Sequence, residues 1–122
     1  ESIVLASGTK HDLRSGKQLL YFYDPQCMHC FHAAQAMAKL NFGETHVIAI
    51  PTTQKQFGQT FLDDTGFKIG KITMEDERLK QVFPFGDPPF AVLLENGRQK
   101  AAITNFDPPM PNSKLVEMEF AK

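Results

Sequence analysis

The sequence contains two cysteines, and they lie three residues apart in the segment Cys27-Met28-His29-Cys30. An apolar run, Leu19–Tyr23, precedes the pair, and a run with helical character, Phe31–Leu40, follows it. Two residues at this spacing at the start of a helix lie on one face, about one turn apart. They can form a disulfide with each other, and the helix N-terminus favours a thiolate. This pattern predicts thiol–disulfide chemistry where a strand leads into a helix.

Length and composition narrow the class of protein. A chain of 122 residues, 42% of them hydrophobic, is long enough for a hydrophobic core, and we expect a single domain over residues 1–122. Two cysteines are too few for a secreted disulfide scaffold. The net charge of −1 gives no indication of a nucleic-acid or anionic membrane partner, and no apolar run approaches the ~20 residues that span a bilayer.

Apolar runs bounded by turn signals predict the strands. The strongest is Gln18–Tyr23, which is apolar almost throughout, as a strand covered on both faces should be. Asn96-Gly97 is a strong hairpin-turn signal. The expected strands are Ile3–Ala6, Gln18–Tyr23, Val47–Ile50, Phe90–Leu94 and Gln99–Thr104, with a short extended segment within Thr65–Met74.

Helical spacing predicts helices over Gln26–Leu40, Gln54–Asp63 and Glu75–Phe83, and a last helix capped by Ser113. We expect Thr52 or Thr53 to cap the second helix, with Phe57, Phe61 and Leu62 facing inward. The order β-β-α-β-α-(α)-β-β-α then predicts an α/β fold with a central mixed sheet and helices on both faces.

At this point the chain resembles the thioredoxin-like family, and the resemblance covers nearly its whole length. A strand leads into Cys27-Met28-His29-Cys30 at the start of a helix, as in that family. Pro89 leads straight into the strand Phe90–Leu94, and Gly97 follows eight residues after this proline. The resemblance implies a thioredoxin-like fold and thiol–disulfide oxidoreductase activity. The residues Asp12-Leu13 and Gly16-Lys17 resemble the approach to the active-site strand in extracytoplasmic relatives of the TlpA type.

The two cysteines then have distinct roles. Cys27, the N-terminal and usually more exposed cysteine, is expected to attack a partner disulfide, and Cys30 is expected to resolve the mixed disulfide. His29 can stabilise the Cys27 thiolate. The Met-His dipeptide is similar to the Pro-His of oxidising DsbA-type proteins, which favours the oxidising side.

The resemblance also implies a substrate-binding side. The proline that faces the cysteine pair in thioredoxins corresponds to Pro89, and we predict a cis Pro88–Pro89 bond. Pro88, Pro89 and Met28 are the expected substrate-binding residues, with an extended segment pairing along the backbone beside Pro89.

The redox group is the cysteine pair itself, so we expect no other cofactor and no metal. The implied partners are protein thiols and disulfides, with a membrane electron-transfer protein as a further partner and no nucleic acid. The chain begins at Glu1 rather than Met. Together with the TlpA-like features, this predicts an extracytoplasmic location, on the periplasmic or secreted side, as a domain of a membrane-anchored protein.

Two positions depart from the thioredoxin pattern. Tyr21 stands where thioredoxins have a buried Asp, six residues before the first cysteine, and Gln26 stands in place of a Trp. The proton acceptor for Cys30 is therefore open between Tyr21 and water.

The alternative function is a copper-binding module of thioredoxin fold without exchange activity. Its soft ligands would come from Cys27, Cys30, Met28 and either His29 or His32. A structural disulfide is the weaker interpretation, because a bridge over so short a spacing constrains little of the chain. Apart from that alternative, His11, His32 and His46 are interpreted as ordinary surface or packing residues.

Overall fold

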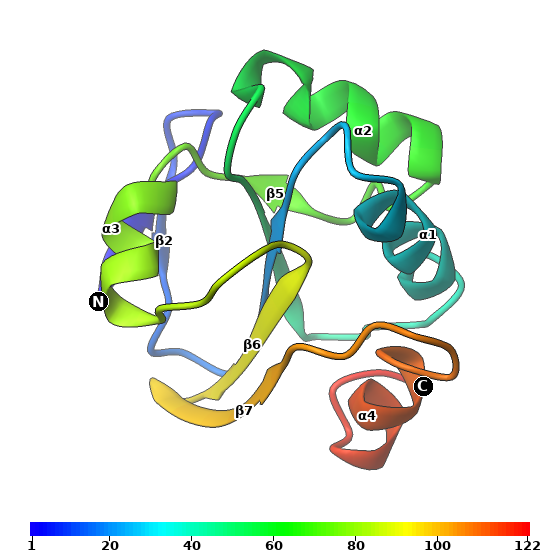
Figure 1. Ribbon diagram of the computed structural model, residues 1–122. Helices are drawn as coiled ribbons and strands as arrows, with labels where there is room; N and C mark the ends of the chain where they lie inside the picture. The colour runs from blue at the N-terminus through cyan, green and yellow to red at the C-terminus, as the bar shows by residue number, and fades with distance from the viewer.

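The computed structural model describes residues 1–122 (Figure 1). One mixed sheet contains the strands β3 (Lys17–Tyr23), β4 (His46–Pro51), β5 (Lys71–Ile72), β6 (Phe90–Glu95) and β7 (Arg98–Ile103). The order across this sheet is β5-β4-β3-β6-β7. The central strand β3 pairs in parallel with β4 and antiparallel with β6.

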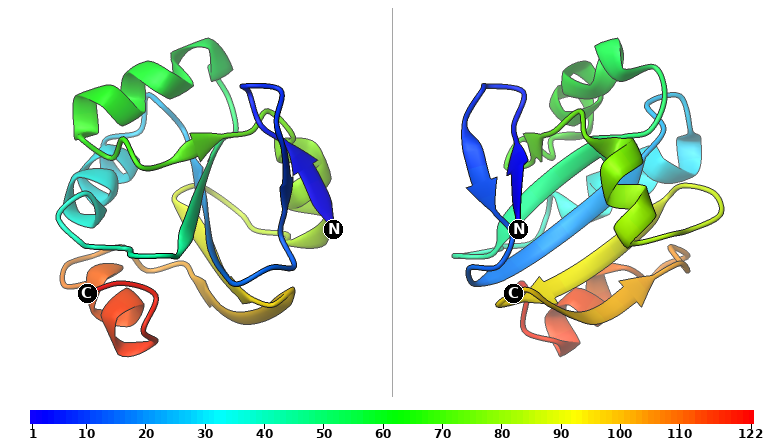
Figure 2. Two further views of the ribbon diagram at one scale, coloured as in Figure 1. Left: turned by 180° about the vertical axis from the view of Figure 1, so that it is seen from behind. Right: turned by 90° about the vertical axis from the view of Figure 1, so that its left-hand side faces the viewer.

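The remaining elements cover the two faces of this sheet. They are the antiparallel pair β1 (Ser2–Val4) and β2 (Lys10–Asp12), the helices α1 (Met28–Met37), α2 (Gly58–Thr65), α3 (Asp76–Val82) and α4 (Asn112–Glu117), and a 3₁₀ turn, η1 (Lys55–Phe57). Helices α1, α2 and α4 pack on one face, and α3 with the β1–β2 pair packs on the other (Figures 1 and 2). None of the helices is both long and apolar enough to cross a bilayer.

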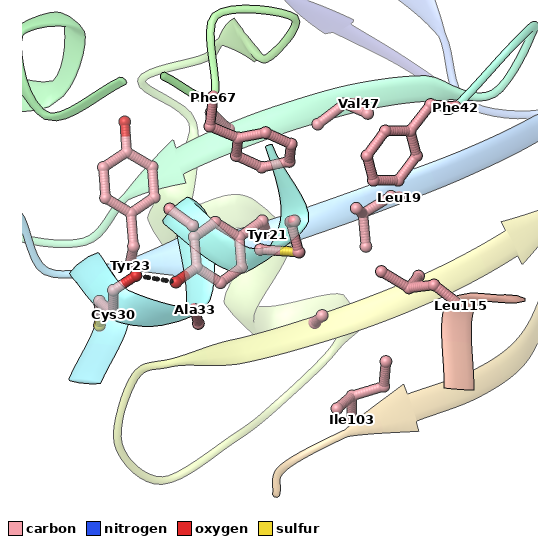
Figure 3. Close-up of a cluster of buried hydrophobic side chains, with 14 of the residues drawn as sticks. Leu19, Tyr21, Tyr23, Cys30, Ala33, Phe42, Val47, Phe67, Ile103 and Leu115 are labelled. Carbon is pink, nitrogen blue, oxygen red and sulfur yellow. Dashed lines mark hydrogen bonds between the residues drawn. The ribbon is translucent and has the colours of Figure 1, made fainter. Parts of the chain in front are cut away.

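Successive side chains of a strand point to opposite sides of the sheet. Both sides of β3 are covered, so side chains of both sets are buried. Leu19, Tyr21 and Tyr23 enter the core beneath α1, which is shown in Figure 3. Leu20 and Phe22 enter the second core, beneath α3 and the β1–β2 pair. All five side chains are fully buried. The apolar run that predicts this strand is therefore explained by cover on both faces, and the predicted α/β mixed sheet with helices on both faces is confirmed.

The hairpin between β6 and β7 turns where the sequence predicts it. Asn96 and Gly97 have φ values of 52° and 83°, both in the left-handed region. Two consecutive residues of this kind form the tight turn whose twist matches antiparallel strands. A side chain at Gly97 would also come within 3.2 Å of Arg14 Cγ, a close contact that glycine avoids.

Several predicted boundaries are wrong. Strand β2 was not expected, because Lys10-His11-Asp12 is polar and pairs only with β1. Helix α1 starts at Met28, not Gln26, because Cys27 is its N-cap residue. Thr52 does not cap a helix: its hydroxyl donates to the carbonyl oxygen of Tyr23 at 3.2 Å. The last helix starts at Asn112, with Pro111 rather than Ser113 as its N-cap residue.

The segment before α2 differs most from expectation. Gln54 has a left-handed φ of 46°, and the 3₁₀ turn η1 follows it before the α-helix begins at Gly58. This change of helical phase turns Phe57 outward, and 47% of its surface is exposed. The expectation that Phe57 faces inward is therefore wrong.

Candidate active site

Cys27 caps the helix that follows it. Its backbone is extended, with φ −90° and ψ 119°, and its Sγ accepts a hydrogen bond from the backbone N–H of Cys30 at 3.2 Å. Capping positions usually carry an oxygen that accepts such a bond. Here the sulfur takes that place, at the end of the helix where the aligned peptide dipoles favour negative charge. Both cysteines are free thiols in the structure.

The two thiols differ in exposure. Cys27 is half-buried, whereas Cys30 lies in the core with no exposed surface. Burial, the largest cause, raises the pKa of the Cys30 thiol well above its ordinary value of 9.0, while the backbone N–H of Asp24 acts in the opposite direction. At neutral pH the inner sulfur is therefore protonated and shielded, and the outer sulfur is the one that another protein can reach.

Tyr21 lies directly beneath the pair. Its hydroxyl donates a hydrogen bond to the carbonyl oxygen of Cys30 at 2.7 Å, the dashed line of Figure 3. Its ring stacks on Tyr23, with centroids 5.6 Å apart. Burial also raises the pKa of this phenol well above 10.0. The Tyr21 hydroxyl therefore donates its hydrogen bond to a carbonyl oxygen of α1, and its raised pKa keeps it protonated at neutral pH.

His29 has a partner that the sequence does not indicate. Its Nε2 lies 3.4 Å from Oδ1 of Asp107, in the loop between β7 and α4. Both side chains are exposed, at 51% and 81%. Asp107 is distant in the chain, and only the packing of this loop against α1 reveals it.

The prolines reach the same end of the sheet as the cysteines. Phe90, at the start of β6, pairs with Phe22 near the end of β3, so Pro89 lies just beyond that pair. Cys27 follows the end of the same strand β3. The Pro88–Pro89 peptide bond is cis, and Pro89 is buried. Met28 is 63% exposed beside Cys27.

The other histidines lie elsewhere. His46 starts β4, opposite Gln18 near the start of β3, and its ring meets that of His11 edge-on at 4.9 Å. This pair is thus at the end of the sheet opposite to Cys27. His32 is exposed on α1. No three His, Cys, Asp or Glu side chains are grouped so that they could hold a metal ion.

Comparison with known proteins supports the fold. No protein-family model and no curated protein sequence matches the chain. Among solved structures, a thioredoxin-like protein from Aeropyrum pernix is similar over 96% of this chain and 88% of that one, with 17% identity and a TM-score of 0.76. A secreted disulfide oxidoreductase of Mycobacterium tuberculosis, described as homologous to E. coli DsbE, is similar over 96% and 92%, with 16% identity and a TM-score of 0.74.

A third similar structure is StoA from Bacillus subtilis, with 14% identity and a TM-score of 0.69 over 98% of this chain and 95% of that one. In each case the alignment takes in nearly the full length of both chains. At this level of identity the likeness establishes the fold. The chain has a thioredoxin-like fold, and the resemblance of the sequence to that family is confirmed at the level of its architecture.

Proposed function

We propose that the protein is a thiol–disulfide oxidoreductase whose redox group is the Cys27–Cys30 pair. The observation that carries the proposal is the contrast between the two sulfurs. One caps α1 and is half-buried; the other lies one turn further on and is fully buried. Accessible attack at the outer sulfur followed by resolution from the inner one is the sequence of steps that this contrast favours.

In the oxidising direction, a partner thiolate attacks the Cys27 sulfur of the disulfide. The Cys27–Cys30 bond breaks, a mixed disulfide forms, and Cys30 leaves and takes up a proton. A second partner thiolate then attacks the partner's own sulfur in the mixed disulfide and releases Cys27. The partner loses two electrons to the pair and gains a disulfide. Reduction of a partner is the same sequence in reverse.

We place the protein on the oxidising side of the thioredoxin-like range, which spans about −270 to −120 mV. Stabilising the outer thiolate favours the reduced pair and makes the disulfide a stronger oxidant. The N-terminal end of α1 and the imidazole of His29 both act in that direction. The proposed partners are protein thiols in an extracytoplasmic compartment, and a membrane electron-transfer protein reoxidises the reduced Cys27–Cys30 pair. The proposed substrate side is formed by Met28, Pro88 and Pro89.

Equilibration with glutathione buffers measures the reduction potential. Comparing the rate at which the protein oxidises reduced ribonuclease with the rate at which it reduces insulin shows which direction of exchange it favours. We expect Cys27→Ser to abolish both activities and Cys30→Ser to accumulate mixed disulfides. The proposal is wrong if Cys27 in the reduced protein resists iodoacetamide at neutral pH. Stoichiometric Cu(I) binding with no exchange activity would identify a copper carrier instead.

A further inference from the structure

A groove of about 240 Å³ opens beside the cysteine pair, between α1 and α2. Pro25 and Gln26, the two residues before Cys27, line it together with Phe57 and Phe61. Adjacent Cα atoms are about 3.8 Å apart. The groove therefore begins within a few ångströms of the backbone of Cys27, on the flank of the site that faces α2.

The floor of the groove is aromatic and rigid. Phe31 meets Phe61 edge-on at 5.8 Å, and Phe61 stacks on the buried ring of Tyr23 at 4.4 Å. The Tyr23 hydroxyl donates to the carbonyl oxygen of Gly58 at 3.0 Å, which ties this stack to the first turn of α2. An occupant would thus meet fixed ring faces rather than a surface that has to be reorganised.

Phe57 lies on a turn that an ion pair anchors, but its own side chain is exposed. Lys55, two residues earlier, forms an ion pair with Asp76 of α3, which fixes the η1 turn. Phe57 nevertheless exposes 47% of its surface. A large apolar side chain on an anchored turn beside a reactive sulfur is a contact surface available to a partner.

Asp64 is the one charged residue that lines the groove. It takes part in no ion pair and in no side-chain hydrogen bond of the chain, whereas its neighbour Asp63 accepts a hydrogen bond from Gln59 at 3.0 Å. The lining therefore combines aromatic faces with one uncompensated carboxylate.

We propose that this groove binds a basic side chain, arginine above all, that flanks the reactive cysteine of a protein substrate. The aliphatic stem and planar guanidinium of arginine can lie across Phe31 and Phe57, and its charge can pair with Asp64. The inference rests on the proposed function, because the occupant is carried there by the partner of the mixed disulfide. It assigns the specificity of that exchange to the α2 flank of the site.

The test uses short peptides with one cysteine, each prepared as a mixed disulfide with the chromophore thionitrobenzoate. Attack by the Cys27 thiolate on the peptide sulfur joins peptide to protein, and the thionitrobenzoate leaves with the bonding electron pair and is measured. Arginine, lysine, leucine or glutamate is placed at each position in turn on either side of the cysteine. We expect arginine at one position to raise the second-order rate about tenfold over leucine, the sum of a cation–π contact and a partly exposed ion pair.

Asp64→Asn should lower the preference for arginine over leucine several-fold, to the part that the cation–π contact supplies. Asp63→Asn is the matched control, because it removes the same charge from the adjacent residue of the same helix and should keep the preference. Phe57→Ala should slow the arginine peptide more than the leucine peptide, because it removes a cation–π contact as well as apolar surface. In the unmodified protein the preference should shrink as salt is added, a measurement that needs no variant.

The outcomes separate the two proposals. An equal arginine preference in Asp64→Asn, a preference for leucine or glutamate, or no dependence on flanking residue overturns the groove assignment while exchange activity stands. Failure of every peptide to release thionitrobenzoate, with Cys27 reduced, overturns the proposed function and the assignment with it.

Discussion

The hydroxyl of Tyr21 donates a hydrogen bond to the carbonyl oxygen of Cys30 at 2.7 Å, inside the core. This hydrogen bond joins the central strand to the helix that carries the cysteine pair, at the position where the resemblance places the acidic side chain of thioredoxins. The phenol therefore has a structural role in positioning α1, and we expect no role for it in moving the Cys30 proton.

Tyr21→Phe tests this role. The substitution keeps the ring and removes one buried hydrogen bond, so we expect a loss of about 0.5–1.5 kcal/mol in the free energy of unfolding, measured by urea denaturation. The rate at which Cys30 resolves a mixed disulfide should change little, and its pH profile should keep its midpoint. A resolution rate that falls by orders of magnitude, with a shifted profile, would show that the phenol handles the proton after all.

Burial of the Cys30 thiol makes the reduced protein sensitive to alkali. The pKa of Cys30 in the folded protein lies above the ordinary 9.0 of the unfolded chain. At a pH between the unfolded and the folded pKa, the unfolded chain releases this proton and the folded protein keeps it. The contribution of this thiol to the free energy of unfolding should be fully present below about pH 9. Above about pH 9 the free energy of unfolding should fall by about 1.4 kcal/mol per pH unit.

The matched variant is Cys30→Ser, measured by urea denaturation across the same pH range. Its alkaline loss should begin only near pH 10, where Tyr21 and Tyr23 ionise in the unfolded chain, since burial also raises the pKa of both phenols. Identical profiles for the two proteins would contradict the assignment of the loss to Cys30.

His29 is expected to stabilise the reduced pair. Replacing it with alanine should make the reduction potential more negative by about 10–30 mV, a modest shift because the imidazole is largely exposed. His32→Ala is the control, since His32 is also exposed on α1 but follows the pair. Equilibration with glutathione measures both variants, and equal shifts would remove any special role for His29.

His46, at the far end of the sheet, should make the protein sensitive to acid. Burial first, and then His11 and Lys71, lower the pKa of His46 below its ordinary 6.5. Below pH 6.5 the unfolded chain binds a proton at His46 that the folded protein does not yet bind. The free energy of unfolding should therefore fall as the pH drops from 6.5 towards the lower pKa of His46 in the folded protein.

His46→Gln removes this titration, and thermal unfolding between neutral and mildly acidic pH measures its effect. The variant should lose less stability over that interval than the unmodified protein. The same decline in both would place the acid sensitivity elsewhere.

Much of the fold could be predicted because its central signals are local. An apolar run such as Gln18–Tyr23 indicates a strand covered on both faces, and the pair Asn96-Gly97 indicates a hairpin turn; both are confirmed. Strand β2 could not be predicted, since Lys10-His11-Asp12 is a polar segment whose pairing depends on β1. The outward turn of Phe57 depends on the left-handed backbone of Gln54, a conformation that residue type alone does not indicate.

The candidate site was predictable only in part, for a similar reason. The cysteine motif is contiguous in the chain, so its place at the start of a helix follows from local spacing. Asp107 beside His29 and Asp64 beside Pro25 are brought in by packing of distant segments. No periodicity or motif in the sequence marks either carboxylate.

The cap at Cys27 has a consequence for how the first turn of α1 behaves during turnover. The atom that accepts the N–H of Cys30 is the same atom that bonds to a partner in the proposed exchange. A sulfur in a disulfide is a poorer acceptor than a thiolate, so each covalent complex should loosen that amide and each release should tighten it again. Deuterium uptake at one peptide group would then follow the catalytic cycle directly.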